Sequence, residues 1–88
     1  MTCVFLSSFK RDLKKIRDGA IQSDIREIIL QIESAESVAQ ITNLKKLRGR
    51  VAHYRIRVGD FRIGVVIESD TITFMRCLNR ADIYKYFP

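Results

Sequence analysis

The sequence has few of the residues that interrupt or cross-link a small protein. Its 88 residues include one proline, which is the last residue, four glycines, two cysteines and no tryptophan. Cys3 and Cys77 are too few for a disulfide framework, so we expect both to be free thiols in a reducing compartment. There is no Pro/Gly-rich linker and no internal repeat, and we therefore expect a single domain over residues 1–88.

Long apolar runs are also missing. No stretch approaches the roughly 18 apolar residues that a membrane span requires. The opening run Met1–Leu6 is too short for the apolar region of a signal peptide and has no basic segment before it. We therefore expect a cytoplasmic protein without membrane contact. Hydrophobic residues still make up 47% of the chain, which is enough to form a core.

Groups that build metal sites and common ribonuclease sites are scarce. His53 is the single histidine, which excludes a pair of histidines for acid–base catalysis, and we interpret it as structural or peripheral. No Cys/His pair has ligand spacing and the acidic residues are scattered, so we expect no metal site and no cofactor. The glycines form no phosphate-binding loop.

What the sequence does contain is an uneven distribution of positive charge. Residues 1–43 carry six basic and six acidic side chains, whereas residues 44–88 carry ten basic and four acidic ones. The whole net charge of +6 therefore belongs to the second half. A one-sided basic surface favours a polyanionic partner, and nucleic acid is the first candidate.

The first half has the spacing of helices. Residues 2–6 predict a short strand, and Ser7 and Ser8 offer an N-cap for a first helix. Asp18–Gly19 predicts the end of that helix, and a second helix follows. Apolar residues recur at helical spacing in both helices, at Phe9, Leu13, Ile16, Ile21, Ile25, Ile28, Ile29 and Ile32.

From residue 44 onward the period changes to the two residues of β-strands. Gly59–Asp60 and Ser69–Asp70 are two-residue turn signals, so we expect strands joined by hairpins. Residues 81–87 predict a short terminal helix or an extended tail. The fold expected is α+β, with an N-terminal strand and two helices packed on a twisted antiparallel four-stranded sheet.

The first hairpin predicts arginines on one face of this sheet. A turn at Gly59–Asp60 places Arg57 opposite Arg62, and Arg55 opposite Gly64. Like charges directly opposite each other destabilise a sheet by up to about 1 kcal/mol per pair, a cost that an anion relieves. Gly64 also leaves a gap in the face where a nucleotide can approach. The alternative is a solvated polar face, neutralised in part by nearby acidic residues.

The second hairpin predicts where the side chains of the third strand point. Pairing across its turn places Cys77 beside Arg62 and Met75 beside Gly64. Arg76 then falls on the apolar side, which requires either an exposed edge or a bulge.

Arginine limits the chemistry that such a face can perform. It keeps its proton, so it is a poor general base but a good stabiliser of developing negative charge. Its planar fork also suits contacts to phosphate oxygens. Tyr84 and Tyr86 are candidate proton-transfer groups if the tail folds over the face. The alternative is that they are core aromatics that anchor the tail.

Three blocks of the sequence resemble signature blocks of the RelE/ParE toxin superfamily. They are Lys46–Gly49, Tyr54–Ile63 and Asn79–Tyr84, and the middle block, YRIRVGDFRI, is the most specific. The resemblance covers nearly the whole chain and is closest to RelE-type toxins. The element order expected from the periodicity, β-α-α-β-β-β, also fits this family.

The resemblance implies the toxin of a type II toxin–antitoxin pair. RelE-like toxins enter the ribosomal A site and cleave mRNA there, by attack of a ribose 2′-hydroxyl on the adjacent phosphate, without a metal. The implied partners are a cognate antitoxin, in a heterodimer or heterotetramer, and mRNA on a 70S-type ribosome. The alternatives are a ParE-like toxin that inhibits DNA gyrase without catalysis, and a plain RNA-binding domain.

Site residues follow from the matching motifs. Arg62 would bind the scissile phosphate and stabilise its transition state, Arg80 would assist the leaving group, and Tyr84 would act as a base or positioning group. RelE has lysines where this chain has Arg55 and Arg57, and many members have histidine where it has Asn79. The basic residues that would contact RNA phosphates are Arg55, Arg57, Lys45, Lys46 and Arg48.

Overall fold

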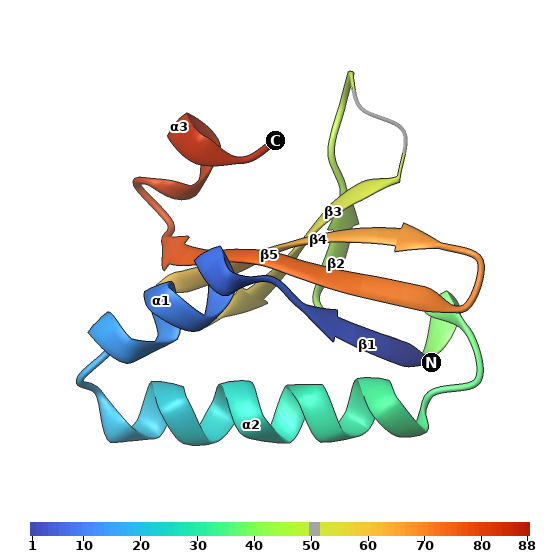
Figure 1. Ribbon diagram of the computed structural model, residues 1–88, viewed down its shortest axis with the longest axis horizontal. Helices are drawn as coiled ribbons and strands as arrows, with labels where there is room; N and C mark the ends of the chain where they lie inside the picture. Colours follow the sequence, from blue (N-terminus) through green and yellow to red (C-terminus); the bar gives the residue numbers. More distant parts are fainter. Residues whose placement is uncertain (50–51) are drawn as a thin grey trace.

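A five-stranded sheet forms the centre of the computed structural model, which describes residues 1–49 and 52–88 (Figure 1). Arg50 and Val51 lie outside the described residues. Arg50 is one of the ten basic residues counted in the second half of the chain. The strand order is β1-β5-β4-β3-β2, in which β2 to β5 are antiparallel and β1 joins β5 in parallel. The strands are β1 (Thr2–Phe5), β2 (Leu44–Lys46), β3 (His53–Val58), β4 (Phe61–Glu68) and β5 (Thr71–Asn79).

Helices lie on both sides of this sheet. The long α2 runs along one side, and the short α3 lies on the other (Figure 1). Within the described part of the chain, no helix has the length and hydrophobicity to span a membrane. The α+β class is as predicted. The sheet differs in two details, because β2 is one strand more than the predicted order contains and β1 joins in parallel. The helices are α1 (Ser7–Lys15), α2 (Gly19–Ser34), a 3-10 turn (Val38–Gln40) and α3 (Ile83–Tyr86).

Asp18 begins the second helix instead of ending the first. Its carboxylate accepts hydrogen bonds from the backbone N–H groups of Ala20 (2.9 Å) and Ile21 (3.3 Å). The first helix has already ended at Lys15. Aspartate satisfies the free N–H groups of a helix start better than it ends a helix, so the end predicted at Asp18–Gly19 is wrong.

The core lies between α1, α2 and the face of the sheet that they cover. The isoleucine stripe of α2 reaches it through Ile25 and Ile32, both buried. The rings of Phe9 and Phe5 lie 5.2 Å and 5.0 Å from that of Phe74, measured between centroids. These contacts confirm the apolar periodicity predicted for both helices. The sheet residues with no exposed surface are Ile56, Ile63, Val65, Ile72 and Phe74.

One extra residue in β5 breaks its register with β4. Gly64 pairs with Arg76, but the next residue of β4 pairs with Phe74. Met75 is therefore the bulged residue and does not lie beside Gly64, where the uninterrupted pattern places it. Its carbonyl oxygen accepts a hydrogen bond of 2.6 Å from the hydroxyl of Ser8. Ser7 and Ser8 lie inside α1, whose N-cap is Leu6, so the N-cap predicted at these serines is wrong. The bulge is thus fastened to the first turn of α1.

The bulge exchanges the two faces of the last part of β5. Cys77 pairs with Ile63 and is 2% exposed in the core, so its predicted place beside Arg62 is wrong. Arg76 instead lies beside Gly64 on the opposite face. Of the two alternatives given for Arg76, an exposed edge or a bulge, the structure therefore has the bulge. The alternation of a strand predicts the wrong face beyond a bulge, because the extra residue turns every following side chain to the opposite face of the sheet.

Candidate nucleic-acid interface

Strand pairing gathers basic residues on the face of the sheet away from α2. Arg57 pairs with Arg62 and Arg55 pairs with Gly64, which confirms both predicted pairings. Lys45 pairs with Arg55, and Arg76 pairs with Gly64, so both join the same face. We call this surface the arginine face, and its members are Lys45, Arg55, Arg57, Arg62 and Arg76.

Backbone carbonyls, not carboxylates, hold two of these arginines. Nη1 of Arg62 donates to the carbonyls of Gly59 (2.8 Å) and Phe61 (2.9 Å) at its own hairpin turn. Nη1 of Arg55 donates to the carbonyl of Asn43 at 3.2 Å, while its buried Nε has no hydrogen-bond partner in the described structure. Neither guanidinium has a carboxylate within ion-pair distance among the described residues, so both charges remain available to an anion.

Arg80 lies just beyond the end of β5, next to the same hairpin turn. Its backbone N–H donates to the carbonyl of Asp60 at 2.7 Å. Its Nε lies 3.9 Å from the carboxylate of Asp60, and both side chains are largely exposed. Exposed pairs of this length contribute little to stability, and solvent and salt screen them. Arg80 is therefore close to Arg57 and Arg62 in the fold and free to exchange this partner for a phosphate.

The three remaining residues predicted to contact RNA, Lys45, Lys46 and Arg48, do not all lie on the arginine face. Lys45 is exposed on the arginine face. Lys46 pairs with Tyr54, so it points to the opposite side of the sheet. Arg48 is exposed in the turn that follows β2 and no strand pairing brings it to the arginine face. The structure thus unites Lys45 with the arginines and points Lys46 to the other side of the sheet.

The C-terminal segment covers the centre of the arginine face. Ile83 and Phe87 are its buried anchors, and neither belongs to the main core cluster. A Cβ atom on Gly64 would lie 2.6 Å from the ring of Phe87, so this ring fills the gap predicted to admit a nucleotide. The ring of His53 lies 5.4 Å from that of Phe87, between centroids. Neither anchor was predicted from the sequence, although their spacing of four residues is typical of one helix face.

Tyr84 and Tyr86 do not anchor the tail. They are 58% and 62% exposed, so their interpretation as core aromatics is wrong. The guanidinium carbon of Arg76 lies over the ring of Tyr86, 5.5 Å from the ring centroid, which is within cation–π range. The tail does fold back over the arginine face, which is the condition set for either tyrosine to take part in proton transfer.

Asp12 is a site residue that the sequence analysis missed. It is 4% exposed, and its Oδ2 accepts from Nε of Arg76 at 2.8 Å and from the backbone N–H of Cys77 at 2.9 Å. Its Oδ1 accepts from Nη2 of Arg76 at 3.2 Å. The hydrogen bond to Asp12 raises the pKa of Arg76. A signal was present, because Asp12 falls beside Leu13 on the apolar stripe, where a carboxylate requires a partner.

Cys77 gives this region a pH dependence. Burial, and then the charge of Asp12, raise the pKa of its thiol to about 12. The unfolded chain loses this proton near pH 8.5, so between the two values the folded state binds more protons and stability falls as the pH rises. We expect a loss of about 1.4 kcal/mol per pH unit above 8.5.

Urea unfolding of the wild type and of Cys77→Ala at several pH values between 8 and 10, on buffers of equal ionic strength, checks this expectation. The difference in free energy of unfolding between the two proteins should shrink as the pH rises. A constant difference would show that the buried thiol does not cause the slope.

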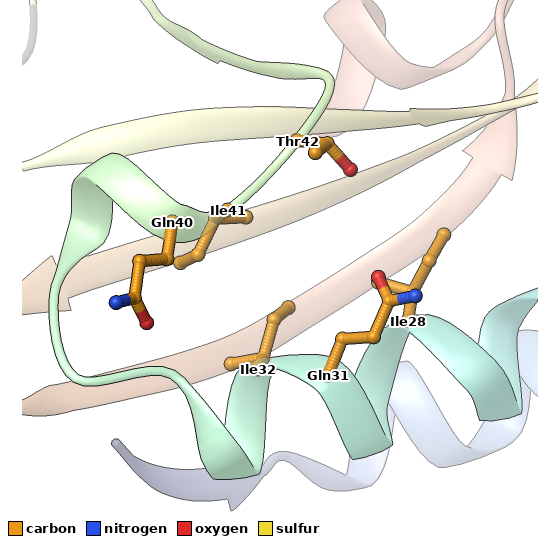
Figure 2. A pocket seen from close by; sticks show the side chains of 6 residues that line it. All are labelled: Ile28, Gln31, Ile32, Gln40, Ile41 and Thr42. Atoms are coloured by element: carbon orange, nitrogen blue, oxygen red, sulfur yellow. The ribbon is translucent and has the colours of Figure 1, made fainter.

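One pocket away from the arginine face is too small to be a ligand site. Figure 2 shows it between α2 and the segment after the 3-10 turn, on the side of the sheet that α2 covers. Its volume is about 10 Å³, room for one water molecule at most. No cluster of potential metal ligands occurs among the described residues. The pocket is lined by Ile28, Gln31, Ile32, Gln40, Ile41 and Thr42.

Comparison with known proteins finds relatives that match over the full fold. The toxin RelE3 of Methanocaldococcus jannaschii is 40% identical over 89 residues, which covers all of both proteins. The structure of a RelB–RelE antitoxin–toxin complex from Methanococcus jannaschii matches with a TM-score of 0.83 and 40% identity, covering 97% of this chain and 99% of that one. The toxin–antitoxin complex RelBE2 of Mycobacterium tuberculosis matches with a TM-score of 0.70 and 25% identity, covering 90% and 96%. No family model matches.

These matches include the arginine-bearing hairpin as well as the helices. The chain belongs to the RelE family of toxins. The resemblance found in its three sequence blocks is therefore confirmed.

Proposed function

We propose that this toxin is a ribosome-dependent endoribonuclease that cleaves mRNA in the ribosomal A site. The observation that carries the proposal is the arginine face. Arg55 and Arg62 have no carboxylate partner among the described residues, and Arg57 is exposed beside them. Unneutralised arginines on adjacent strands are an arrangement suited to a polyanion with regularly spaced phosphates.

The chemistry proposed is an internal transesterification, in which a ribose 2′-hydroxyl attacks the phosphate on the 3′-oxygen of the same ribose. The 2′-hydroxyl loses its proton and attacks the phosphorus, the bond to the 5′-oxygen breaks, and a 2′,3′-cyclic phosphate and a 5′-hydroxyl result. Negative charge builds on the phosphate oxygens during this step, where Arg62 stabilises it. Arg80 stabilises the charge on the departing 5′-oxygen. Arg55 and Arg57 hold the phosphates on either side.

Proton transfer requires a group other than arginine. The tail that covers the arginine face supplies two exposed tyrosines, and Tyr84 is the one that matches the family motif. We assign Tyr84 as the base or positioning group for the 2′-hydroxyl. Its place depends on the anchors of the tail, because Ile83 precedes it and Phe87 follows it in the same short segment.

The proposed inhibitor is a cognate antitoxin. The two relatives of known structure described above are complexes of a toxin with its antitoxin. Here such a partner would bring acidic side chains to the second half of the chain, which carries the whole positive excess. An antitoxin segment that covers Arg57 and Arg62 would block phosphate binding directly. The complex formed is a heterodimer or heterotetramer.

Expression of the toxin in a bacterial host separates this function from inhibition of gyrase. We expect incorporation of labelled amino acids to stop before DNA synthesis, with plasmid supercoiling unchanged. Arg62→Ala should abolish the arrest, whereas Arg26→Ala, which removes an equal charge from the exposed side of α2, should not. Relaxed plasmids with continuing protein synthesis would favour the ParE-like alternative instead.

A further inference from the structure

We propose that Arg76 is a further phosphate-binding residue of the arginine face and that Asp12 is its positioning residue. This inference rests on the proposed function and adds a residue that the family motifs do not include. It starts from the bulge, which turns Arg76 from the core side to the arginine side. Arg76 thereby stands across Gly64 from Arg55, at the end of the same row.

The guanidinium of Arg76 keeps an open edge. Asp12 receives one N–H from Nε and one from Nη2. The remaining nitrogen, Nη1, has no hydrogen-bond partner among the described residues, and the side chain is 29% exposed. A guanidinium has five N–H donors, so most of its donors are still free to bind phosphate oxygens.

Asp12 holds this arginine in a fixed orientation. Its carboxylate is buried and is itself tied to the backbone N–H of Cys77, so it cannot follow a moving partner. The ring of Tyr86 lies over one face of the guanidinium at 5.5 Å. The two contacts restrict both tilt and rotation. An arginine that is already ordered loses less conformational entropy when it binds an anion.

Positioning and net charge make opposite predictions for Asp12. If the arginine face attracted RNA by charge alone, removing a carboxylate would strengthen binding. If Asp12 orients Arg76, removing its charge weakens binding although the protein becomes more positive. A role confined to holding α1 on β5 would change stability and leave RNA affinity at the level that charge dictates.

The test measures binding of a fluorescent single-stranded RNA oligonucleotide by anisotropy over a range of salt concentrations. Asp12→Asn keeps an oxygen to accept from Cys77 and loses the charge, and we expect it to weaken binding several-fold. Arg76→Gln should weaken binding and reduce the slope of log affinity against log salt by about 0.7, the value for one lost phosphate contact on a single strand. Tighter or unchanged binding by Asp12→Asn, or an unchanged slope for Arg76→Gln, would overturn the inference.

Two further variants keep the result interpretable. Arg76→Lys preserves the charge but not the fork, so we expect weaker binding with an unchanged slope, and affinity equal to the wild type would count against the inference even if Asp12→Asn fails to fold. Arg62→Gln in the same assay distinguishes the two proposals. If its slope falls while that of Arg76→Gln does not, Arg76 is not a contact and the proposed function stands. If neither slope falls, the arginine face does not bind RNA, and both proposals fail.

Discussion

Replacing Arg62 with alanine is expected to lower the rate of mRNA cleavage on the ribosome by about a hundred- to a thousandfold, the range for losing one preorganised donor to a transition state. Arg62 lies at the hairpin end of the arginine face, opposite Arg57 and two residues from Gly64. Its hydrogen bonds to Gly59 and Phe61 hold the side chain at the turn before any RNA arrives. The measurement is the single-turnover rate with saturating toxin, which isolates the chemical step.

The fold should survive this change. Removing Arg62 ends its repulsion with Arg57, a like-charge pair worth up to about 1 kcal/mol. Arg62→Lys keeps the charge but not the planar, forked guanidinium. Its cleavage rate is expected to lie between those of the wild type and of Arg62→Ala. Arg26→Ala on α2 serves as the control of equal charge. Full activity in a well-folded Arg62→Ala would remove Arg62 from the site.

Adding a methyl group to Gly64 is expected to dislodge the C-terminal tail. The new Cβ would lie 2.6 Å from the Phe87 ring, closer than carbon atoms approach, and such overpacking typically costs about 1–3 kcal/mol. In a Phe87→Ala background the same methyl group enters vacated space, so its cost should vanish. Urea unfolding of Gly64→Ala, Phe87→Ala and the double variant should therefore show a coupling of about 1 kcal/mol or more.

The tail variants also test the site. If Tyr84 depends on the Phe87 anchor, Gly64→Ala should reduce cleavage together with stability. Gly19→Ala is the matched control, because nothing lies within 4 Å of a Cβ at that position, at the start of α2. Additive free energies for Gly64→Ala and Phe87→Ala would show that the two residues do not share the space that the structure gives them.

The arginine face was predictable because one turn sets its register. Gly59–Asp60 allows a two-residue hairpin, and from there the pairing of Arg57 with Arg62 follows by counting. The distribution of charge and the block around Phe61-Arg62 pointed to the same face independently. Local turn chemistry and a strict period of two were sufficient for this part of the fold.

The missed residues depend on contacts distant in sequence. The bulge at Met75 is held by Ser8, and Arg76 is held by Asp12, both of α1 and more than 60 residues away. The alternation of residues along a strand does not indicate a bulge when the bulge is held by a residue of a distant helix. Phe87 was missed for a related reason. Its ring packs directly on the backbone of Gly64, where there is no side chain, and this contact is also distant in sequence.

The most direct test of the account is to incubate the purified toxin with a defined mRNA, free in solution and on programmed ribosomes, and to map the new RNA ends. We predict cleavage only on the ribosome, within the codon in the A site, with a 2′,3′-cyclic phosphate on the upstream fragment. Intact mRNA on the ribosome, from a toxin that still arrests growth, would contradict the account and place its target outside RNA.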